Sequence, residues 1–483
     1  MEGAIGKIRE LERVARELEP DADTRRHITD RVVRYAAGFL DKIHDGLAFN
    51  ADGNDGSGLY AAPISEEPLE IEAILDLVEK NVDTPALNPA SGGHLAYIPG
   101  GGIYPAALGD YLADVANRYA GVYYVGPGAV RMEHMLTRWM SDLIGYPAGS
   151  GGDLTSGGSI ANLVGIVTAR DARELKAKDF AKAVVYMTDQ AHHSVDKALR
   201  IAGLGECIVR HIETDKRFRM RADTVDSAIQ KDRQDGLIPW LVVASAGTTD
   251  AGAVDPIDAV ADIAERHDLW LHVDAAYGGF FILCDPARNM FEGIGRADSV
   301  VMDPHKGLFL PYGCGAVLIK DRSLLGKAHY YQANYMQDVA GAEDEYSPAD
   351  HSPELTRHYR GLRLWLPLKL FGIRPFRACL EEKLHLARYF HVEIQKVDGF
   401  EAGPTPDLSV VTYRYIPKKG NADEFNRRII EEVHKDGRVF LSSTILDGKF
   451  TLRLAALAFR THLDTIDTAL DVLRRAVKRV KAA

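Results

Sequence analysis

The sequence alternates between stretches with helical spacing and four apolar runs: AVVYMTD at residues 183–189, PWLVVASAGTT at 239–249, LWLHVDAAY at 269–277 and SVVMD at 299–303. Each run is short, rich in β-branched or aromatic residues, and followed by polar or small residues, which predicts a strand. Such alternation is typical of an α/β domain with a mostly parallel central sheet flanked by helices. We expect that domain to span residues 86–380.

Two segments of different character flank this domain. Residues 1–85 repeat apolar side chains such as Ile28, Val32 and Ala36 at helical spacing, which predicts helices. Residues 381–483 combine helical stretches with the strand-like runs LSVVTYRY and KFTLRLAAL, which predicts a small C-terminal α+β domain. A chain of 483 residues is also too long for one hydrophobic core.

The composition is that of an ordinary soluble globular protein. Asp and Glu number 69 against 58 Lys and Arg, and the net charge of -11 disfavours binding to nucleic acid or to an anionic membrane surface. The N-terminal MEGAIGKIRELERVARELEP is charged throughout, so we expect neither a secretory signal nor a membrane span. Four widely spaced cysteines lack metal-ligand spacing, which predicts no metal site and a reducing, cytoplasmic location.

One lysine stands between two predicted strands. Lys306 lies in DPHKG (303–307), the connection between SVVMD and the apolar run 316–319. The simplest interpretation is a solvated surface lysine, because an unpaired buried ammonium is costly. Burial would instead lower the pKa of the lysine, and the neutral amine would be suited to forming an imine. The residue alone does not decide between these interpretations.

Small residues precede a helical pattern in LTSGGSIANLVGIVTARDA, residues 154–172. Gly157, Gly158 and Ser159 would let the backbone approach an anion at the start of a helix, where free amides and the helix dipole attract it. Ser and Gly are also ordinary helix caps. This segment therefore leaves phosphate binding and simple capping open.

Polar side chains follow three of the predicted strands. Asp274 ends LWLHVD, where it could hold a ring nitrogen protonated or serve as a cap or ion-pair partner. Thr248 follows PWLVVASAG, and His192 in TDQAHHS offers an imidazole that could stack on a planar ring. Ligands of open parallel sheets bind beyond the carboxyl ends of the strands, so we expect these side chains to share one site.

Together these features match one cofactor. A phosphate cradle, a ring-stacking imidazole, a carboxylate for a ring nitrogen and a lysine follow in this order, each at a predicted strand end. Pyridoxal 5′-phosphate (PLP) presents a phosphate, a flat ring, a pyridine nitrogen and an aldehyde that condenses with lysine. We therefore expect PLP, which also explains Lys306.

The sequence resembles the group II PLP-dependent amino-acid decarboxylases, the family of the aromatic L-amino-acid decarboxylases. The motifs that carry the resemblance cover nearly the whole chain: GHLAYIPGGGIYPAALGDYLAD, TSGGSIANL, TDQAHHSV, HVDAAYGG, DPHKG and SPELTRHYRGLRLWLPLKLFG. The resemblance implies the type I, aspartate aminotransferase-like fold. It also implies a homodimer with active sites at the subunit interface, in which residues 1–85 pack on the partner subunit.

Carried over by position, the resemblance assigns the reacting groups. Lys306 would be the Schiff-base lysine, His192 the ring-stacking base and Asp274 the partner of the pyridine nitrogen. The other cofactor-binding residues would be Gly157, Gly158, Ser159, Thr248, Ala276 and His305.

A loop tyrosine completes the implied catalytic set. The sequence HYYQANYMQDVAG places Tyr335 where the family carries a tyrosine that protonates the reaction intermediate. Tyr330, Tyr331 and Tyr346 lie near it in the sequence and leave the choice open. The polarity and glycine content of this loop suit a lid over the substrate.

The expected reaction is decarboxylation of an L-amino acid to the amine and carbon dioxide. An aromatic substrate is favoured by Tyr97, Ile98, Tyr123 and Tyr124, which could form a pocket for a flat side chain or could instead be interface packing. The segments that carry them, LAYIPGGGIYP and VYYVGP, contain no Arg or Lys to bind an acidic side chain.

Two positions depart from the family pattern. Gly307 stands where family members usually have a large aromatic residue, and Ile160 replaces an acidic residue after the phosphate-binding Ser. Gly307 and the glycines at 100–102 are expected to open room for an indole or dihydroxyphenyl ring. Both departures bear on the substrate more than on the reaction type.

Other functions stay open. They are a PLP-dependent carbon-carbon lyase or aldehyde synthase, a decarboxylase of glutamate or 2,4-diaminobutyrate, and an inactive scaffold protein. Tyr335 and His192 favour decarboxylation over the first of these. The intact His305-Lys306 pair and Asp274 argue against the last.

Overall fold

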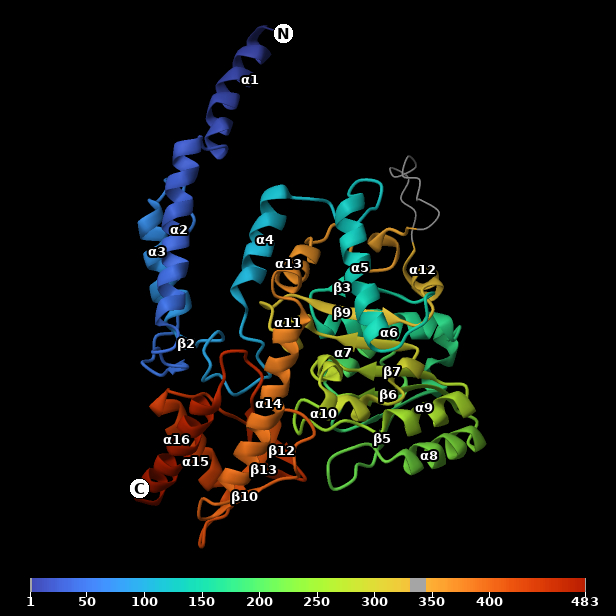
Figure 1. Ribbon diagram of the computed structural model, residues 1–483. Coiled ribbons are helices and arrows are strands. Elements are labelled where there is room, and N and C mark those ends of the chain that lie inside the picture. Colours follow the sequence, from blue (N-terminus) through green and yellow to red (C-terminus); the bar gives the residue numbers. More distant parts are fainter. Residues whose placement is uncertain (1, 331–344, 483) are drawn as a thin grey trace.

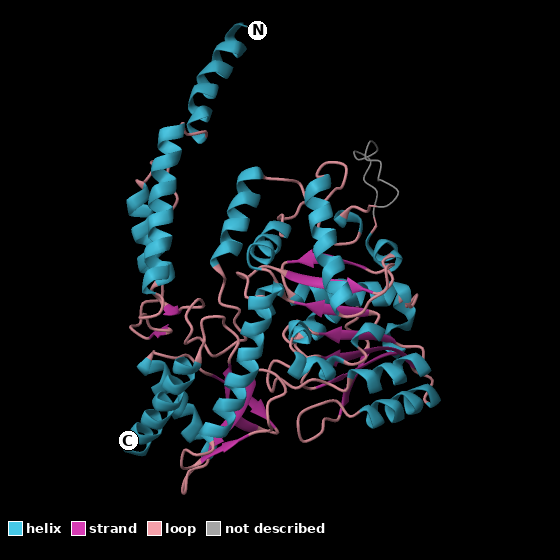
Figure 2. Cartoon of the chain, viewed as in Figure 1, coloured by secondary structure: helices cyan, strands magenta, loops and turns pink. Residues whose placement is uncertain are grey.

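The computed structural model describes residues 2–330 and 345–482. At the centre of its larger part is a seven-stranded sheet of order β3-β9-β8-β7-β6-β4-β5 (Figures 1 and 2). Only β9 runs antiparallel to its neighbours, so the expected mostly parallel sheet is confirmed. The strands are β3 (Gly151–Thr155), β4 (Ala183–Thr188), β5 (Ile208–Ile212), β6 (Ile238–Ser245), β7 (Trp270–Asp274), β8 (Ser299–Met302) and β9 (Gly315–Ile319).

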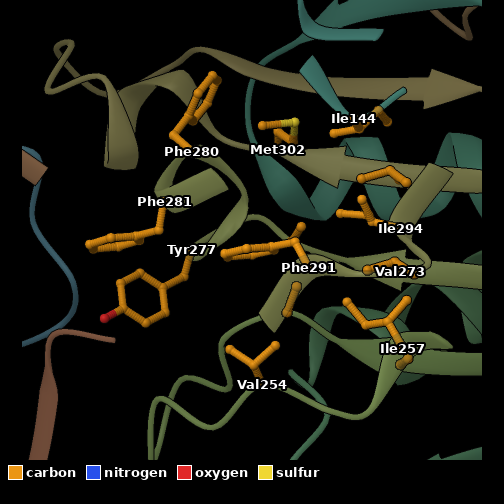
Figure 3. Packing of buried hydrophobic residues seen from close by; sticks show 14 of the residues in the cluster. Ile144, Val254, Ile257, Val273, Tyr277, Phe280, Phe281, Phe291, Ile294 and Met302 are labelled. Carbon is orange, nitrogen blue, oxygen red and sulfur yellow. The ribbon is translucent and has the colours of Figure 1, made fainter. Parts of the chain in front are cut away.

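Successive residues of the central strands face two different cores. In β6, Val242 belongs to one buried cluster and Val243 to the other, so the strand is apolar on both faces. Figure 3 shows part of the first core, in which Ile257 lies near Val273 of β7. The first core is covered by α4 (Tyr104–Ala116), α5 (Pro127–Leu143), α8 (Ala222–Gln234), α9 (Ile257–Arg266), α10 (Asp285–Arg288) and α13 (Gly361–Phe371), and the second by α6 (Gly158–Ala172), α7 (Ser194–Ile201) and α12 (Ser323–His329).

A second, antiparallel sheet forms the core of the C-terminal part, as expected for a small α+β domain. Its order is β10-β11-β13-β12, and helices pack on it through a separate buried cluster. The elements are β10 (Phe400–Ala402), β11 (Val410–Tyr415), α15 (Ala422–Asp436), β12 (Ser442–Leu446), β13 (Lys449–Ala455) and α16 (Leu463–Ala482).

Helix α14 (Ile373–Ile394) belongs to both parts of the chain. Phe376 and Leu380 near its start lie in the core of the large sheet, whereas Phe390 and Ile394 near its end lie in the core of the small sheet. The domain boundary that we propose at residue 380 therefore falls inside one continuous helix.

The N-terminal helices extend away from the rest of the chain (Figure 1). They are α1 (Glu2–Ala15), α2 (Ala22–Lys42) and α3 (Ile71–Val78), and the two-residue strands β1 (Phe49–Asn50) and β2 (Ala86–Leu87) pair beneath them. Leu11 of α1 and Val33 of α2 are among several exposed apolar residues on these helices. None of the described helices combines the length and apolar composition that a bilayer-spanning segment requires.

Two strands of the large sheet were not predicted from the sequence patterns. β3 reads GGDLT, and glycine and aspartate are rare in strands. It is nevertheless buried along its whole length and pairs with β9. β5 lies at the other edge of the sheet and is mostly half-buried or exposed, which removes the continuous apolar run that identified its neighbours.

Candidate active site

A cavity of about 240 Å³ lies where β3, β6, β7 and β8 end. The short helix α11 (Pro304–Gly307) contributes Lys306 to its wall, and the start of α6 forms another side. All nine residues that the sequence assigned to cofactor binding line this one cavity: Gly157, Gly158, Ser159, His192, Thr248, Asp274, Ala276, His305 and Lys306.

Lys306 is not a solvated surface residue. Its side chain is 23% exposed, and Nζ lies 3.2 Å from Oδ2 of Asp303, which is 1% exposed. A carboxylate this close stabilises the ammonium that burial would otherwise destabilise. Asp303 closes the run SVVMD, where sequence analysis treated it only as the end of a strand.

The turn before α6 can accept only glycine. Gly157 has φ of +152°, a conformation essentially confined to glycine. A Cβ on Gly158 would lie 2.9 Å from Oδ2 of Asp303 and 3.2 Å from the Cβ of Ala276. The first N–H groups of a helix have no partner within the helix, so this cradle fits the phosphate of PLP.

Asp274 is a buried carboxylate with neutral donors only. Its Oδ2 accepts a hydrogen bond from Nδ2 of Asn162 at 3.0 Å, and its Oδ1 accepts one from the backbone N–H of Ala276 at 3.1 Å. Within residues 2–330 and 345–482 it forms no ion pair. A protonated ring nitrogen would supply the missing positive charge, which is the interaction that PLP offers.

Two histidines flank the cradle and the ring position. His192 is half-buried, and its Nδ1 lies 2.7 Å from Oγ of Ser194. Nδ1 of His305 donates to the carbonyl oxygen of Cys314 at 2.7 Å. Burial lowers the pKa of both histidines, while Asp274 opposes this at His192 and Asp303 opposes it at His305. Both rings are therefore neutral at physiological pH.

The four residues expected to contact the substrate do not line the cavity of their own chain. Ile98 is buried in the large core, and Tyr97 packs on Phe440 with ring centroids 5.7 Å apart. Tyr97 and Tyr124 are 62% and 64% exposed, and Tyr123 is half-buried.

The expectation that glycine opens room for a large ring is wrong at Gly307 and at Gly100. A Cβ on Gly307 would lie 2.8 Å from the Cβ of Phe280, so that aromatic ring already fills the space. A Cβ on Gly100 would lie 2.2 Å from the carbonyl oxygen of His305. Both glycines therefore permit close packing around α11 rather than enlarging the pocket.

Tyr335 and Tyr331 lie outside the described residues. Among the other loop tyrosines, Tyr346 is stacked between the rings of His134 and His351, with centroids 3.8 and 4.1 Å away. Its hydroxyl donates to the carbonyl oxygen of Gly152 at 3.3 Å, and burial raises the pKa of Tyr346 to about 12. Neither Tyr346 nor Tyr330 lines the cavity.

Sequence reasoning left several polar residues of the cavity wall unassigned, among them Asp303, Asn162 and Ser194. Asn162 is the fifth residue of α6 and Ser194 the first residue of α7. Asn162 and Ser194 carried only the signal of polarity within a helical pattern, whereas Asp303 follows a predicted strand directly, so the rule that selected Asp274 could have found it.

Comparisons with known proteins agree with this geometry. The model of the pyridoxal-dependent decarboxylase conserved domain matches residues 58–416. The aromatic-L-amino-acid decarboxylase of Bacillus atrophaeus is 34% identical over 82% of this chain and 84% of its own length. The phenylacetaldehyde synthase of Petunia hybrida is 31% identical over 86% of both chains.

A solved structure also covers nearly all of the chain. The crystal structure of Oryza sativa TDC with PLP and tryptamine has a TM-score of 0.89 and 25% identity, and the match covers 95% of this chain and 99% of that one. The type I fold expected from the sequence is therefore confirmed. The chain belongs to the pyridoxal-dependent decarboxylase family and is a PLP-dependent amino-acid decarboxylase.

Proposed function

We propose that this enzyme decarboxylates an aromatic L-amino acid to the corresponding amine. The observation that carries the choice of substrate is the lining of the cavity. Its described residues include no arginine, and its one lysine, Lys306, is paired with Asp303. An acidic substrate side chain would therefore lack a cationic partner there, and its desolvation would be uncompensated. The names of relatives such as tryptophan decarboxylase 2 of Oryza sativa and tyrosine decarboxylase 2 of Arabidopsis thaliana support the same choice.

The proposed roles of Lys306, Asp274, Gly158 and Ser159 follow from their positions in the cavity, and that of Tyr335 rests on the sequence alone. Lys306 would hold PLP covalently through its side-chain amine. Bound PLP supplies an electron sink for the pair left behind when carbon dioxide departs. Asp274 keeps the ring nitrogen protonated, and the cradle at Gly158 and Ser159 fixes the phosphate. Tyr335 returns a proton to the substrate Cα, a general-acid contribution of about 10² to 10⁴ in rate.

We also propose that the enzyme acts as a homodimer. Exposed apolar side chains gather on α1, α2 and α4, and contiguous patches of this kind mark interaction surfaces. Tyr97 and Tyr124 would then be covered by the partner subunit and could complete the partner's substrate pocket. The residues on these helices are Ile5, Ile8, Leu11, Val14, Ile28, Val32, Val33, Tyr104, Leu108, Tyr111, Leu112 and Val115.

An aldehyde synthase is the second candidate, because the phenylacetaldehyde synthase of Petunia hybrida is 31% identical to this chain. In that case oxygen consumption, hydrogen peroxide and the aldehyde would replace the amine as the main outcome. Tyr335 favours the decarboxylase, since it offers a proton to the same carbon.

A substrate panel tests the proposal. The purified enzyme with PLP is assayed for carbon dioxide, amine, aldehyde and peroxide with tryptophan, tyrosine, dihydroxyphenylalanine, glutamate and 2,4-diaminobutyrate. We expect kcat/KM for one of the aromatic substrates to exceed that for glutamate by about a hundredfold or more. Efficient turnover of glutamate or diaminobutyrate with the aromatic substrates ignored would refute the substrate, and aldehyde as the main product would favour the synthase.

A further inference from the structure

A continuous chain of buried hydrogen bonds leads from the interior of the large sheet toward the cavity. Nε1 of Trp270 lies 2.8 Å from Oγ of Ser299, which lies 2.7 Å from Nδ1 of His272. Nε2 of His272 lies 2.8 Å from Oδ1 of Asn162. All four side chains are buried, so water does not compete for these bonds.

The chain of hydrogen bonds divides at Asn162. One hydrogen of its amide goes to Oδ2 of Asp274 at 3.0 Å, and the other goes to Oγ of Ser194 at 2.9 Å. The Ser194 hydroxyl lies 2.7 Å from Nδ1 of His192. One amide group therefore contacts the carboxylate that faces the ring nitrogen and, through one hydroxyl, the imidazole assigned to the ring face.

The chemistry of its ends fixes the direction of every bond. An indole N–H can only donate, so Ser299 accepts from Trp270. At the other end Asp274 accepts from the amide nitrogen of Asn162, so Oδ1 of Asn162 faces Nε2 of His272 and must accept its proton. Nδ1 of neutral His272 is then an acceptor, and Ser299 donates its hydroxyl hydrogen to it. Burial lowers the pKa of His272 to about 4, which keeps the ring neutral. The two hydrogens of the Asn162 amide are thereby directed at Asp274 and Ser194.

The same reasoning fixes the tautomer of His192. Oγ of Ser194 accepts from Asn162 and lies 2.7 Å from Nδ1 of His192. The backbone N–H of Ser194 donates to that nitrogen at 3.2 Å, so the hydroxyl of Ser194 faces an acceptor and donates to it as well. Nδ1 is therefore an acceptor, and the neutral ring carries its proton on Nε2. Since Ser194 occupies Nδ1, Nε2 is the nitrogen left for a ligand in the cavity that this ring lines.

We propose that Asn162 is a positioning residue that sets both Asp274 and the Nε2–H tautomer of His192 through this directional chain. His192 would then act at the substrate as a hydrogen-bond donor, not as a base. The hydrogen-bond chain also couples the two faces of the cofactor site, because the amide that donates to Asp274 also donates to Ser194, whose hydroxyl contacts His192. A fully satisfied buried network of this kind can hold its members in one arrangement.

The direct test is the protonation of His192 in solution. The full-length apoenzyme is labelled with [¹⁵N]histidine, and the ring signals of His192 are identified by their absence in His192→Gln. We expect the pattern of a neutral ring protonated on Nε2 at pH 7.5. In Ser194→Ala the backbone N–H of residue 194 still donates to Nδ1, so we expect Nε2–H to remain the major tautomer while the Nδ1–H fraction rises measurably. A wild-type ring protonated on Nδ1, or a tautomer ratio in Ser194→Ala identical to that of the wild type, would overturn the proposal.

Two substitutions then separate the branches of the chain. Asn162→Asp places a carboxylate against Asp274, and we expect it to weaken PLP binding about tenfold or more. Ser194→Ala should change the Kd for PLP by less than about threefold but should lower kcat about tenfold. Thr168→Val is the matched control, since Thr168 is a fully buried hydroxyl on the same helix whose partners in the described chain are Val164 and His329. Equal effects of all three variants on kcat and PLP Kd would show a purely structural role and refute the proposal.

Discussion

The ammonium of Lys306 depends on one buried carboxylate. Asp303 lies three residues before it and turns toward it across α11, so a single turn of helix brings the pair together. Oδ1 of Asp303 has no hydrogen-bond partner in the described chain, and Oδ2 lies 3.2 Å from Nζ of Lys306. The pairing holds Lys306 at the cavity without removing it from the reach of a ligand.

Lys306→Ala should remove the covalent attachment of PLP and lower turnover about a thousandfold or more, since binding alone does not replace a nucleophile. Borohydride reduction of the holoenzyme followed by peptide mass spectrometry measures the attachment. Circular dichroism of the variant checks that it is folded. A reducible cofactor adduct on another lysine in this variant would contradict the assignment.

Tyr335→Phe should slow the return of a proton to the substrate Cα, so that oxygen competes and the ratio of aldehyde and peroxide to amine rises. The lost general-acid step is worth about 10² or more in rate of amine formation. The Tyr330→Phe variant is the control, because Tyr330 is 58% exposed and does not line the cavity. If the product ratio changes in Tyr330→Phe but not in Tyr335→Phe, then another tyrosine, not Tyr335, returns the proton.

Helix α6 shows how one element serves both packing and ligand binding. Its buried face includes Ala161 and Val164 in the second core, while its first residues close the phosphate cradle and Asn162 reaches the centre of the site. A helix start supplies unpaired N–H groups without any special side chain, which leaves glycine free to provide the close approach.

Gly158→Ala should weaken PLP binding about tenfold or more, because the new Cβ must crowd Asp303 and Ala276 at a cost of about 1–3 kcal/mol. Gly128→Ala is a matched control. Gly128 lies in the first turn of α5, and a Cβ added there would have no other atom within 4 Å, so this change should leave PLP binding unaltered and stabilise the fold by about 0.5 kcal/mol. Spectral titration with PLP gives both dissociation constants, and equal values would contradict the cradle.

Buried residues join the large domain to the small C-terminal domain. His94 pairs with Phe440 of the small domain, and its neighbour Leu95 lies in the core of that domain. Helix α14 links the same core to the large sheet. The N-terminal helices instead extend away from both domains with apolar side chains exposed; α2 and α3 contact each other, through Arg31 and Glu72 for example, but no residue of either helix is buried.

The stability of the protein should fall on acidification in part through His94. Burial lowers the pKa of His94 to about 4, below the usual value near 6.5 of an unfolded chain. The unfolded state therefore takes up a proton first, and the contribution present above pH 6.5 is lost as pH falls toward 4. Between pH 7 and 5 this amounts to about 2 kcal/mol. Urea unfolding at pH 7 and pH 5 gives the free energy of unfolding at each pH. This free energy should fall by about 2 kcal/mol less in His94→Leu than in the wild type. Equal falls in both proteins would contradict the assignment.

Charge on the exposed apolar helices should disrupt the proposed dimer. Leu112→Asp combined with Val115→Asp on α4 would bury unpaired carboxylates in the interface, at a cost of several kcal/mol. Light scattering after gel filtration should give twice the chain mass for the wild type and the single chain mass for the variant. Ile201→Asp on α7, equally exposed but outside this surface, should remain dimeric. A wild-type monomer would refute the proposal.

Local patterns in the sequence determined the strands that carry the site and the residues that follow them. Apolar runs with β-branched residues identified β4, β6, β7 and β8, and the strand-end rule then selected His192, Thr248, Asp274 and Lys306. The rule works because a parallel sheet places the carboxyl ends of its strands at one edge. The apolar pattern failed at β3, because Gly151 and Gly152 interrupt the apolar run of a strand that is nevertheless fully buried.

Only the tertiary structure decided which side chains contact one another. Asn162 meets Asp274 across 112 residues of sequence and His272 across 110, and no local pattern encodes such pairs. The space at Gly307 was likewise decided by Phe280, which comes from a different segment of the chain. Periodicity records whether a residue is buried, because burial follows from the geometry of its own helix or strand. The identity of its partners depends on how distant elements pack, and that determines the hydrogen bonds and free volume of the site.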